Sequence, residues 1–125
     1  MQASTIRFID ANIFLSRWDD AAARDYLETL DPEKDYTSVT VLGEVYHVLT
    51  RKGVDDVFRL IRRLMAMTTV LEVTQDDLFN AVKNPIDIEI NDKISIAVMR
   101  RNGIDTILSY DKGFDQDKTI KRIGL

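Results

Sequence analysis

Short apolar segments alternate with longer helical segments along this chain, and this alternation restricts the possible folds more than any other feature. Five segments rich in apolar or β-branched residues are expected to form strands: residues 5–9, 36–38, 69–73, 106–109 and 119–123. The segments between them show helical spacing or helix-capping residues: 11–18, 21–30, 41–52, 55–67, 76–83 and 92–101. Strands that alternate with helices favour right-handed crossovers and a parallel sheet covered on both faces. The sequence therefore predicts an α/β fold.

Composition narrows the chemistry that such a fold could perform. The chain has 125 residues, which suits one domain, with 17 Lys and Arg, 21 Asp and Glu, one His and no Cys. The absence of cysteine excludes disulfide frameworks, cysteine zinc sites and thiol nucleophiles. A single His excludes a His-rich metal site and disfavours a Ser-His-Asp triad. Any catalysis is therefore expected to depend on carboxylates.

The location of the protein is predicted from two further features. No uncharged stretch approaches the ~20 apolar residues that a membrane-spanning helix needs. Residues 1–7 show no basic region followed by an apolar run, so no secretory leader is expected. The chain is predicted to be cytoplasmic, with no membrane partner.

Four acidic residues from distant parts of the chain fall where one edge of the sheet would lie. Asp10 and Asp111 follow the first and fourth strands, Asp92 starts the helix before the fourth strand, and Glu44 lies about one turn into the helix after the second. Ligands bind beyond the carboxyl ends of the strands in open parallel sheets. The four carboxylates are therefore expected to converge.

Convergence of carboxylates requires a counter-charge. Two of them about 5 Å apart repel by about 3 kcal/mol at an effective dielectric of roughly 20, so either protons or a cation must be present. Ligation by oxygen alone favours Mg²⁺ or Mn²⁺. A simpler interpretation stays open at this point, because Asp residues at strand ends and helix starts are common helix caps.

The four acids lie in four short motifs. These are FIDANIF at 8–14, Ser38 followed six residues later by Glu44, NDKISIA at 91–97 with Gly103 eleven residues after Asp92, and ILSYDKGF at 107–114. In this order and at these intervals, they resemble the motifs of the PIN domain family, the nuclease fold of VapC-type toxins and related RNA-processing enzymes. Asp92 is preferred over Asp87 and Glu89 as the third acid because of its spacing to Gly103 and its place at the helix start.

The resemblance implies a three-layer α/β/α fold, one PIN-like domain over residues 1–125, with a five-stranded parallel sheet in the order 3-2-1-4-5. It implies cleavage of single-stranded RNA by a metal-activated water, leaving 5′-phosphate and 3′-hydroxyl ends. The implied catalytic and metal-binding residues, for Mg²⁺ or Mn²⁺, are Asp10, Glu44, Asp92 and Asp111. The implied supporting residues are Asn12, Ser38 and Ser109, the last where many members have Thr. Two further candidates are Asp115, as an acid behind the site, and Lys112, as a phosphate contact.

The same resemblance implies partners and leaves alternatives. A homodimer is expected, as is a small antitoxin protein if the chain is a toxin. A housekeeping RNA-processing nuclease and a catalytically inactive PIN-like binding domain are the alternatives within this fold. An aspartyl-phosphate phosphatase is disfavoured because Asn12, rather than Asp, lies two residues after Asp10. A receiver domain is disfavoured because the strand at 69–73 contains Glu72 but no Asp.

Other prominent side chains are given simpler structural roles. Two groups of basic residues are expected to be solvated rather than to follow an RNA backbone: Arg51, Lys52, Arg59, Arg62 and Arg63, and Lys118, Lys121 and Arg122. Three aromatic residues are expected in the core rather than in a partner groove: Trp18, Tyr26 and Phe58. Six acids are assigned to caps and solvated faces: Asp19, Asp20, Asp55, Asp56, Asp76 and Asp77.

Overall fold

A computed structural model describes residues 5–125; residues 1–4, part of the segment used to look for a leader, lie outside the described residues. Five parallel strands form one sheet in the order β3-β2-β1-β4-β5. They are β1 (Arg7–Ile9), β2 (Asp35–Ser38), β3 (Thr69–Leu71), β4 (Thr106–Leu108) and β5 (Lys121–Ile123). The predicted α/β class and the predicted strand order are both confirmed.

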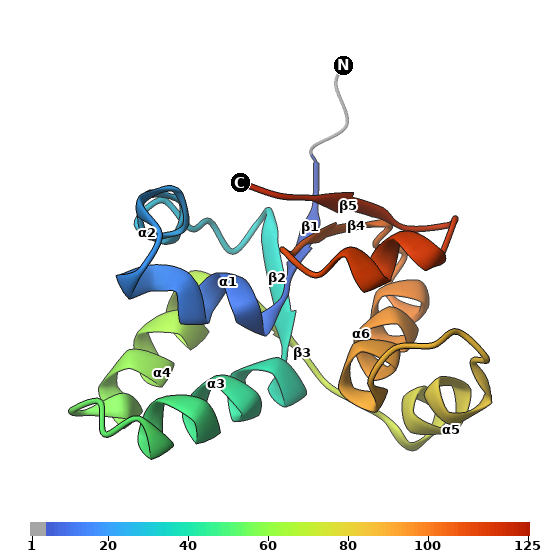
Figure 1. The fold of residues 1–125 in the computed structure, drawn as a ribbon, viewed down its shortest axis with the longest axis horizontal. Coiled ribbons are helices and arrows are strands. Elements are labelled where there is room, and N and C mark those ends of the chain that lie inside the picture. Colours follow the sequence, from blue (N-terminus) through green and yellow to red (C-terminus); the bar gives the residue numbers. More distant parts are fainter. Residues whose placement is uncertain (1–4) are drawn as a thin grey trace.

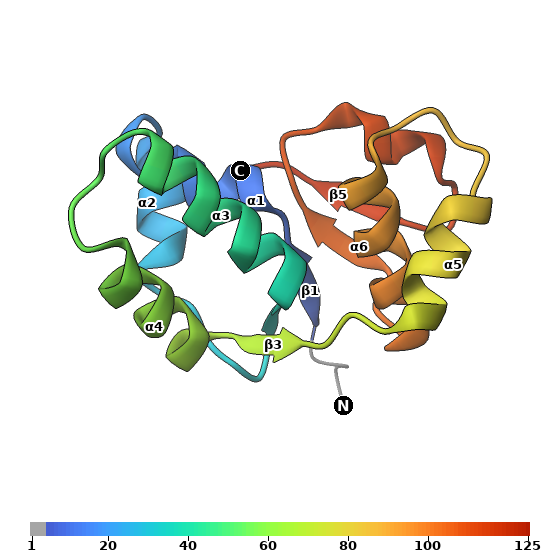
Figure 2. The same ribbon diagram turned by 90° about the horizontal axis from the view of Figure 1, so that it is seen from below.

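Helices cover both faces of the sheet. They are α1 (Ala11–Leu15), α2 (Ala21–Leu27), α3 (Val39–Arg51), α4 (Val57–Met67), α5 (Gln75–Lys83) and α6 (Ile90–Arg101), with 3-10 turns η1 (Ser16–Trp18) and η2 (Lys112–Gln116). Right-handed crossovers along β1-β2-β3 place α1 to α4 on one face, whereas the return to β4 and on to β5 places α5, α6 and η2 on the other. Figure 1 shows this division, with α1 to α4 in blue to green and α5, α6 and η2 in yellow to red. Figure 2 shows it from below.

Local residues start and end several of these helices. The Ser38 hydroxyl caps α3 by accepting a hydrogen bond from the Val41 N–H at 3.2 Å. A capping box starts α5, in which Thr74 and Asp77 each bind the other's backbone N–H. Gly103 follows α6 with a φ of 69°, a conformation that favours glycine. These residues fix the helix ends that lead into and out of the sheet.

The core lies between the central strands and the helices. Phe8, Ile9, Ile107 and Leu108 of β1 and β4 are fully buried, and α6 is buried without a break from Ile94 to Met99. Two of the aromatic residues expected in the core are not there, since Trp18 is 50% exposed and Phe58 66% exposed. Trp18 ends the three-residue turn η1 and Phe58 is the second residue of α4, and at such positions residue type alone does not determine which face packs inward.

Some strand and cap predictions differ from the structure. The outer strands β3 and β5 are shorter than expected, because only residues 69–71 and 121–123 pair with a neighbour. Asp77 was assigned to caps and solvated faces; it does belong to the capping box of α5, but it is only 1% exposed and also forms an ion pair with Arg101 at 2.9 Å. Within residues 5–125, no helix has the length and apolar character needed to cross a membrane.

Candidate active site

The site lies where the order of the strands reverses. From β1 the chain continues to β2 on one side, and from β4 it continues to β5 on the other, so the connections after β1 and β4 diverge. Such a switch point leaves a crevice at the carboxyl ends of the strands. The pairing of Ile9 with Leu108 continues as a hydrogen bond from the Asp10 N–H to the Leu108 carbonyl at 3.0 Å. This register places Asp10 beside Ser109.

Asp10 is a buried carboxylate with three hydrogen-bond donors. It is 6% exposed, and its Oδ1 accepts the Ala11 N–H at 2.8 Å, so it is the N-cap of α1. Its Oδ2 accepts the Ser109 hydroxyl at 2.7 Å and the Asn12 amide at 3.1 Å. Asp10 is therefore both a helix cap and a site acid, so the two interpretations left open by the sequence do not exclude each other.

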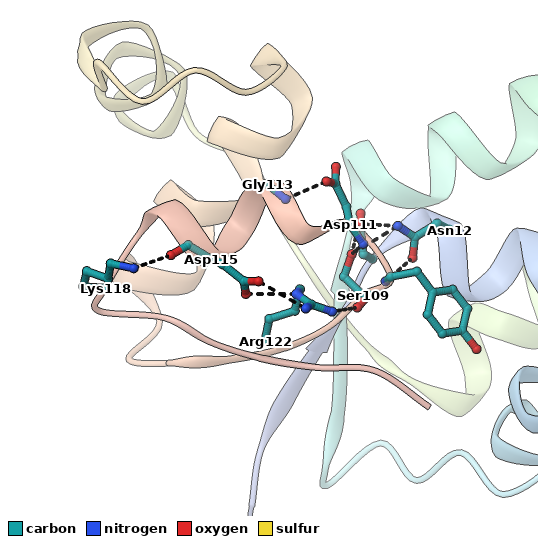
Figure 3. Close-up of polar contacts among 9 residues, drawn as sticks. Asn12, Ser109, Asp111, Gly113, Asp115, Lys118 and Arg122 are labelled. Atoms are coloured by element: carbon teal, nitrogen blue, oxygen red, sulfur yellow. Dashed lines mark hydrogen bonds and ion pairs between the residues drawn. The ribbon is translucent and has the colours of Figure 1, made fainter.

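The Ser109 hydroxyl has no remaining hydrogen-bonding capacity. It donates to Asp10, and it accepts the Asn12 amide at 3.1 Å and the Asp111 N–H at 3.0 Å. A hydroxyl has one donor and two acceptor positions, so all three are used and the proton must point at Asp10. Asn12 also accepts the Tyr110 N–H at 3.2 Å. Figure 3 shows Asn12, Ser109 and Asp111 grouped at this turn.

Glu44 and Asp92 approach from the two helices on either side. Glu44 of α3 accepts the Asn91 amide of α6 at 3.2 Å, which links the two helical layers across the crevice. Asp10, Glu44 and Asp92 line one small cavity of about 10 Å³ together with Ala11, Thr40, Val41, Asn91 and Ser95. That volume is about the size of one water molecule.

Asp111 completes the acidic group from the β4–η2 turn. Its Oδ1 accepts the Gly113 N–H at 2.8 Å, so it caps η2, and its side chain is exposed. Its negative charge raises the pKa of both Asp10 and Asp92. Four carboxylates that are separated along the sequence thus interact at one edge of the sheet.

The electrostatic cost of this arrangement appears in Asp92. Burial first, and then the charges of Asp10 and Asp111, raise the pKa of Asp92 from 3.8 to about 7. Burial also raises the pKa of Asp10, and the hydrogen bond from Ser109 and that from Ala11 act in the opposite direction. Near neutral pH, Asp92 therefore retains a proton for part of the time, which relieves the repulsion among these carboxylates.

The side chains of the site have the chemistry that a hard divalent cation requires. All the ligands offered are carboxylate oxygens, which Mg²⁺ and Mn²⁺ prefer, and a cation would relieve the repulsion that otherwise protonates Asp92. Within residues 5–125, no group of three or more Asp, Glu, His or Cys side chains is already arranged to hold one ion. The carboxylates would have to turn toward a cation to share it.

The remaining predicted residues lie around this group. Ser38 is buried and caps α3, so it acts on Glu44 only through the start of that helix. The Asp115 carboxylate pairs with Arg122, and Lys112 is exposed next to Asp111. Arg122 was expected to be solvated, but only 18% of its side chain is exposed.

Two contacts in the site were not found from the sequence. They are the Asn91–Glu44 hydrogen bond and the interaction of Arg122 with the Ser109 carbonyl oxygen at 3.2 Å. Both join segments far apart along the chain, and no local pattern marks them. The motif containing Asn91 was the only available signal.

A larger groove lies away from these acids. It has a volume of about 600 Å³ and is lined by residues of α5 and α6 and the segment between them, including the Asp77–Arg101 ion pair. None of the four site carboxylates lines it. Its size alone therefore does not make it the reactive centre.

Comparison with known families gives one match over most of the chain. The model of the PIN domain family matches residues 7–118. This range includes all four carboxylates and every element from β1 to η2. A comparison with curated protein sequences gives no match.

Solved structures give further similarities. The chain resembles Mycobacterium tuberculosis VapC20, described as a Sarcin-Ricin loop cleaving toxin, with 26% identity, a TM-score of 0.70, and coverage of 87% of this chain and 92% of that one. It resembles VapBC2 from Rickettsia felis, solved bound to a DNA fragment from its promoter, with 13% identity, a TM-score of 0.74, and coverage of 97% and 99%. A toxin-antitoxin complex from Klebsiella pneumoniae gives 15% identity, a TM-score of 0.71, and coverage of 91% and 94%.

Proposed function

Because the chain belongs to the PIN domain family, we propose that it is a divalent-metal-dependent endoribonuclease acting on single-stranded RNA. The observation that carries the proposal is the electrostatic coupling of Asp92 with Asp10 and Asp111 at the switch point of the sheet. Glu44 lines the same cavity as Asp10 and Asp92. Four carboxylates in one place destabilise the folded protein, because they repel one another. The stability of the fold therefore does not explain why they lie together.

The proposed roles follow from the chemistry of the side chains. Asp10, Glu44, Asp92 and Asp111 would hold Mg²⁺ or Mn²⁺, which when bound lowers the pKa of a water and offsets charge on the scissile phosphate. Ser109 and Asn12 keep the Asp10 carboxylate in one orientation, as partners of ligands do in metal sites generally. Asp92 must release its proton for a cation to bind.

No protein nucleophile is required by this mechanism. The chain has no Cys, and its one His, His47, is exposed and does not line the cavity. A water that attacks the phosphorus and displaces the 3′ oxygen would leave 5′-phosphate and 3′-hydroxyl ends on the cleaved RNA. These ends distinguish the proposed reaction from one in which the RNA's own 2′-hydroxyl attacks.

Cleavage of a labelled single-stranded RNA by the purified chain tests the proposal. We expect cleavage in Mg²⁺ or Mn²⁺, with 5′-phosphate ends, and a loss of at least 100-fold in EDTA or in D10N. The matched control is D19N, which makes the same change at an exposed acid outside the site and should cleave normally. Full cleavage in EDTA would refute metal dependence, and full cleavage by D10N would refute the site.

We further propose that the protein is the toxin of a toxin–antitoxin pair and a homodimer. The similarity to VapC20 and to toxin–antitoxin complexes supports this role. Expression of the wild-type chain should arrest cell growth, whereas expression of D10N should not. Co-expression of a small protein from a neighbouring reading frame should relieve the arrest. Growth that is unaffected by the active chain would favour a housekeeping RNA-processing role. Light scattering of the purified chain tests the dimer.

A further inference from the structure

Arg122 of β5 joins two segments that flank the acidic site. Its Nε and Nη2 donate to the Asp115 carboxylate of η2 at 3.0 and 3.2 Å, and its Nη1 donates to the Ser109 carbonyl oxygen at 3.2 Å. Figure 3 shows the guanidinium between Asp115 on one side and Ser109 on the other. The planar fork of arginine suits this paired contact.

The position of Arg122 follows from the sheet. β5 is an edge strand, and Arg122 lies opposite Ile107 of β4 in the register, while the Ser109 N–H donates to the Ile123 carbonyl at 3.0 Å. The backbone of Ser109 is therefore held by β5 through its N–H and through its carbonyl oxygen. The next residues, Tyr110 and Asp111, turn into η2.

The turn held by Arg122 carries the polar groups that face Asp10. The Ser109 hydroxyl donates to Asp10, and the Asp111 N–H donates back to that hydroxyl. Rotation of the peptide between Ser109 and Tyr110 would displace the carbonyl oxygen that Arg122 binds, and with it the following backbone that brings the Asp111 N–H to the Ser109 hydroxyl. Arg122 thus acts on Asp10 through Ser109, without touching it.

Charge links Arg122 to the site as well. Its hydrogen bonds with Asp115 raise the pKa of Arg122, and the charge of Asp111 adds to this effect. The same ion pair lowers the pKa of Asp115. The Asp115 carboxylate thus lies against the positive charge of Arg122, which would otherwise compete with a cation for the nearby carboxylates.

We propose that Arg122, held by Asp115, is a positioning residue that fixes the Ser109–Tyr110–Asp111 turn in the conformation the acidic site requires. The expected effect of Arg122 on catalysis rests on the proposed ribonuclease function, whereas its effect on the turn does not. Asp115 therefore contributes through Arg122 rather than by approaching the four acids.

R122K tests the proposal, because lysine keeps the positive charge but lacks the planar guanidinium that donates to Asp115 and Ser109 together. The matched control is R101K: Arg101 likewise donates twice or more to one carboxylate, that of Asp77, and to one carbonyl oxygen, that of Glu72, but between α5 and α6. Two readouts are combined for each variant: amide hydrogen exchange of Tyr110 and Asp111, and kcat and KM for RNA cleavage.

For R122K we expect exchange at Tyr110 and Asp111 to become at least tenfold faster. We expect kcat to fall about tenfold with KM within about twofold. R101K should leave both readouts near the wild-type values. D115N, which keeps Arg122 and removes its charged partner, should change both readouts in the same direction by less, and it replaces R122K if that variant does not fold.

The outcomes separate this proposal from the proposed function. Unchanged exchange at Tyr110 and Asp111 in R122K and D115N would overturn the positioning role, as would equal changes in R101K. If the wild-type chain cleaves no RNA, the proposed function fails, and the exchange measurement still decides whether Arg122 fixes the turn. Faster exchange with an unchanged kcat would also overturn the proposal, because the site would then not require that conformation.

Discussion

The hydroxyl of Ser109 donates a 2.7 Å hydrogen bond to the carboxylate of Asp10 across 99 residues of sequence. This contact joins the end of β4 to the end of β1 at the point where the sheet reverses its order. The hydrogen bond stabilises the charged form of Asp10 in a place where burial favours the neutral form. Ser109 thus helps keep Asp10 ionised.

S109A tests this relationship through the pH dependence of cleavage. Loss of the hydroxyl removes a contribution that lowers the pKa of Asp10, so that pKa should rise further above its ordinary value. The acidic limb of the kcat/KM profile should therefore move to higher pH, and activity at pH 7 should fall by about tenfold or more. S109T retains the hydroxyl and should keep the wild-type profile. An S109A profile that superimposes on the wild type would contradict this role.

D92N should stabilise the metal-free protein at alkaline pH. The pKa of Asp92 is about 7 in the folded chain and near 3.8 when unfolded, so the folded state binds more protons between these values. Stability therefore falls as the pH rises through that range, and the full penalty is present above pH 7. D92N removes it, with an expected gain of about 1–2 kcal/mol at pH 8 after allowing for solvent screening.

Thermal unfolding in EDTA measures this effect. The gain should be largest at pH 8 and smaller at pH 5, where Asp92 is already protonated in the folded state. D87N makes the same change at an exposed acid five residues earlier, whose charge is not among those that raise the pKa of Asp92, and should have little effect. A gain in stability of equal size at pH 5 and pH 8 would show that the charge of Asp92 does not destabilise the folded protein.

The sequence was sufficient for the architecture because local and global signals agree. Buried β1 and β4 are short apolar runs, and the crossover rules then allow few topologies. The acids at 10 and 111 were recognisable because Asp10 directly follows β1 and Asp111 lies two residues after the predicted fourth strand. The sequence could not show that Arg122 is half-buried or that Asn91 binds Glu44, because these contacts depend on the packing of segments far apart along the chain.

The same limit explains the errors in burial. Phe58 was expected in the core because it is a large aromatic residue, but it is exposed in the first turn of α4. Asp77 resembles an ordinary first-turn acid, and it does bind the Thr74 N–H, yet the packing of α5 against α6 also brings Arg101 to it. One local role was therefore predicted, and the long-range role was missed.

D77N should destabilise the fold without changing the chemistry. Burial opposes ionisation of Asp77, but hydrogen bonds from Arg101 and Thr74 outweigh it and lower its pKa. The stability gained from this carboxylate is present above its unfolded pKa and is lost as the pH falls through the lower folded value. At pH 7, D77N should lose about 1–3 kcal/mol in urea unfolding. The exposed neighbour Asp76 gives the control D76N, and equal losses in both variants would contradict the account.

K112A should weaken RNA binding rather than the chemical step. Lys112 is exposed and directly follows Asp111, so its ammonium group can meet a phosphate beside the acids. In a D10N background that prevents cleavage, K112A should bind single-stranded RNA several-fold more weakly. The slope of log affinity against log salt concentration should fall in magnitude by about 0.7. K118A changes another exposed lysine beyond η2 and should bind like the parent. If the affinities of K112A and the parent depend equally on salt concentration, Lys112 does not contact the RNA phosphates.

Anomalous scattering from crystals of the wild-type chain soaked in Mn²⁺ locates a cation bound by the acidic residues. We expect a peak within bonding distance of the Asp10 carboxylate and of at least two others among Glu44, Asp92 and Asp111, and no such peak in D10N. A chain that cleaves RNA in Mn²⁺ but shows no peak among these carboxylates, or shows its peak elsewhere, would contradict the proposed metal site.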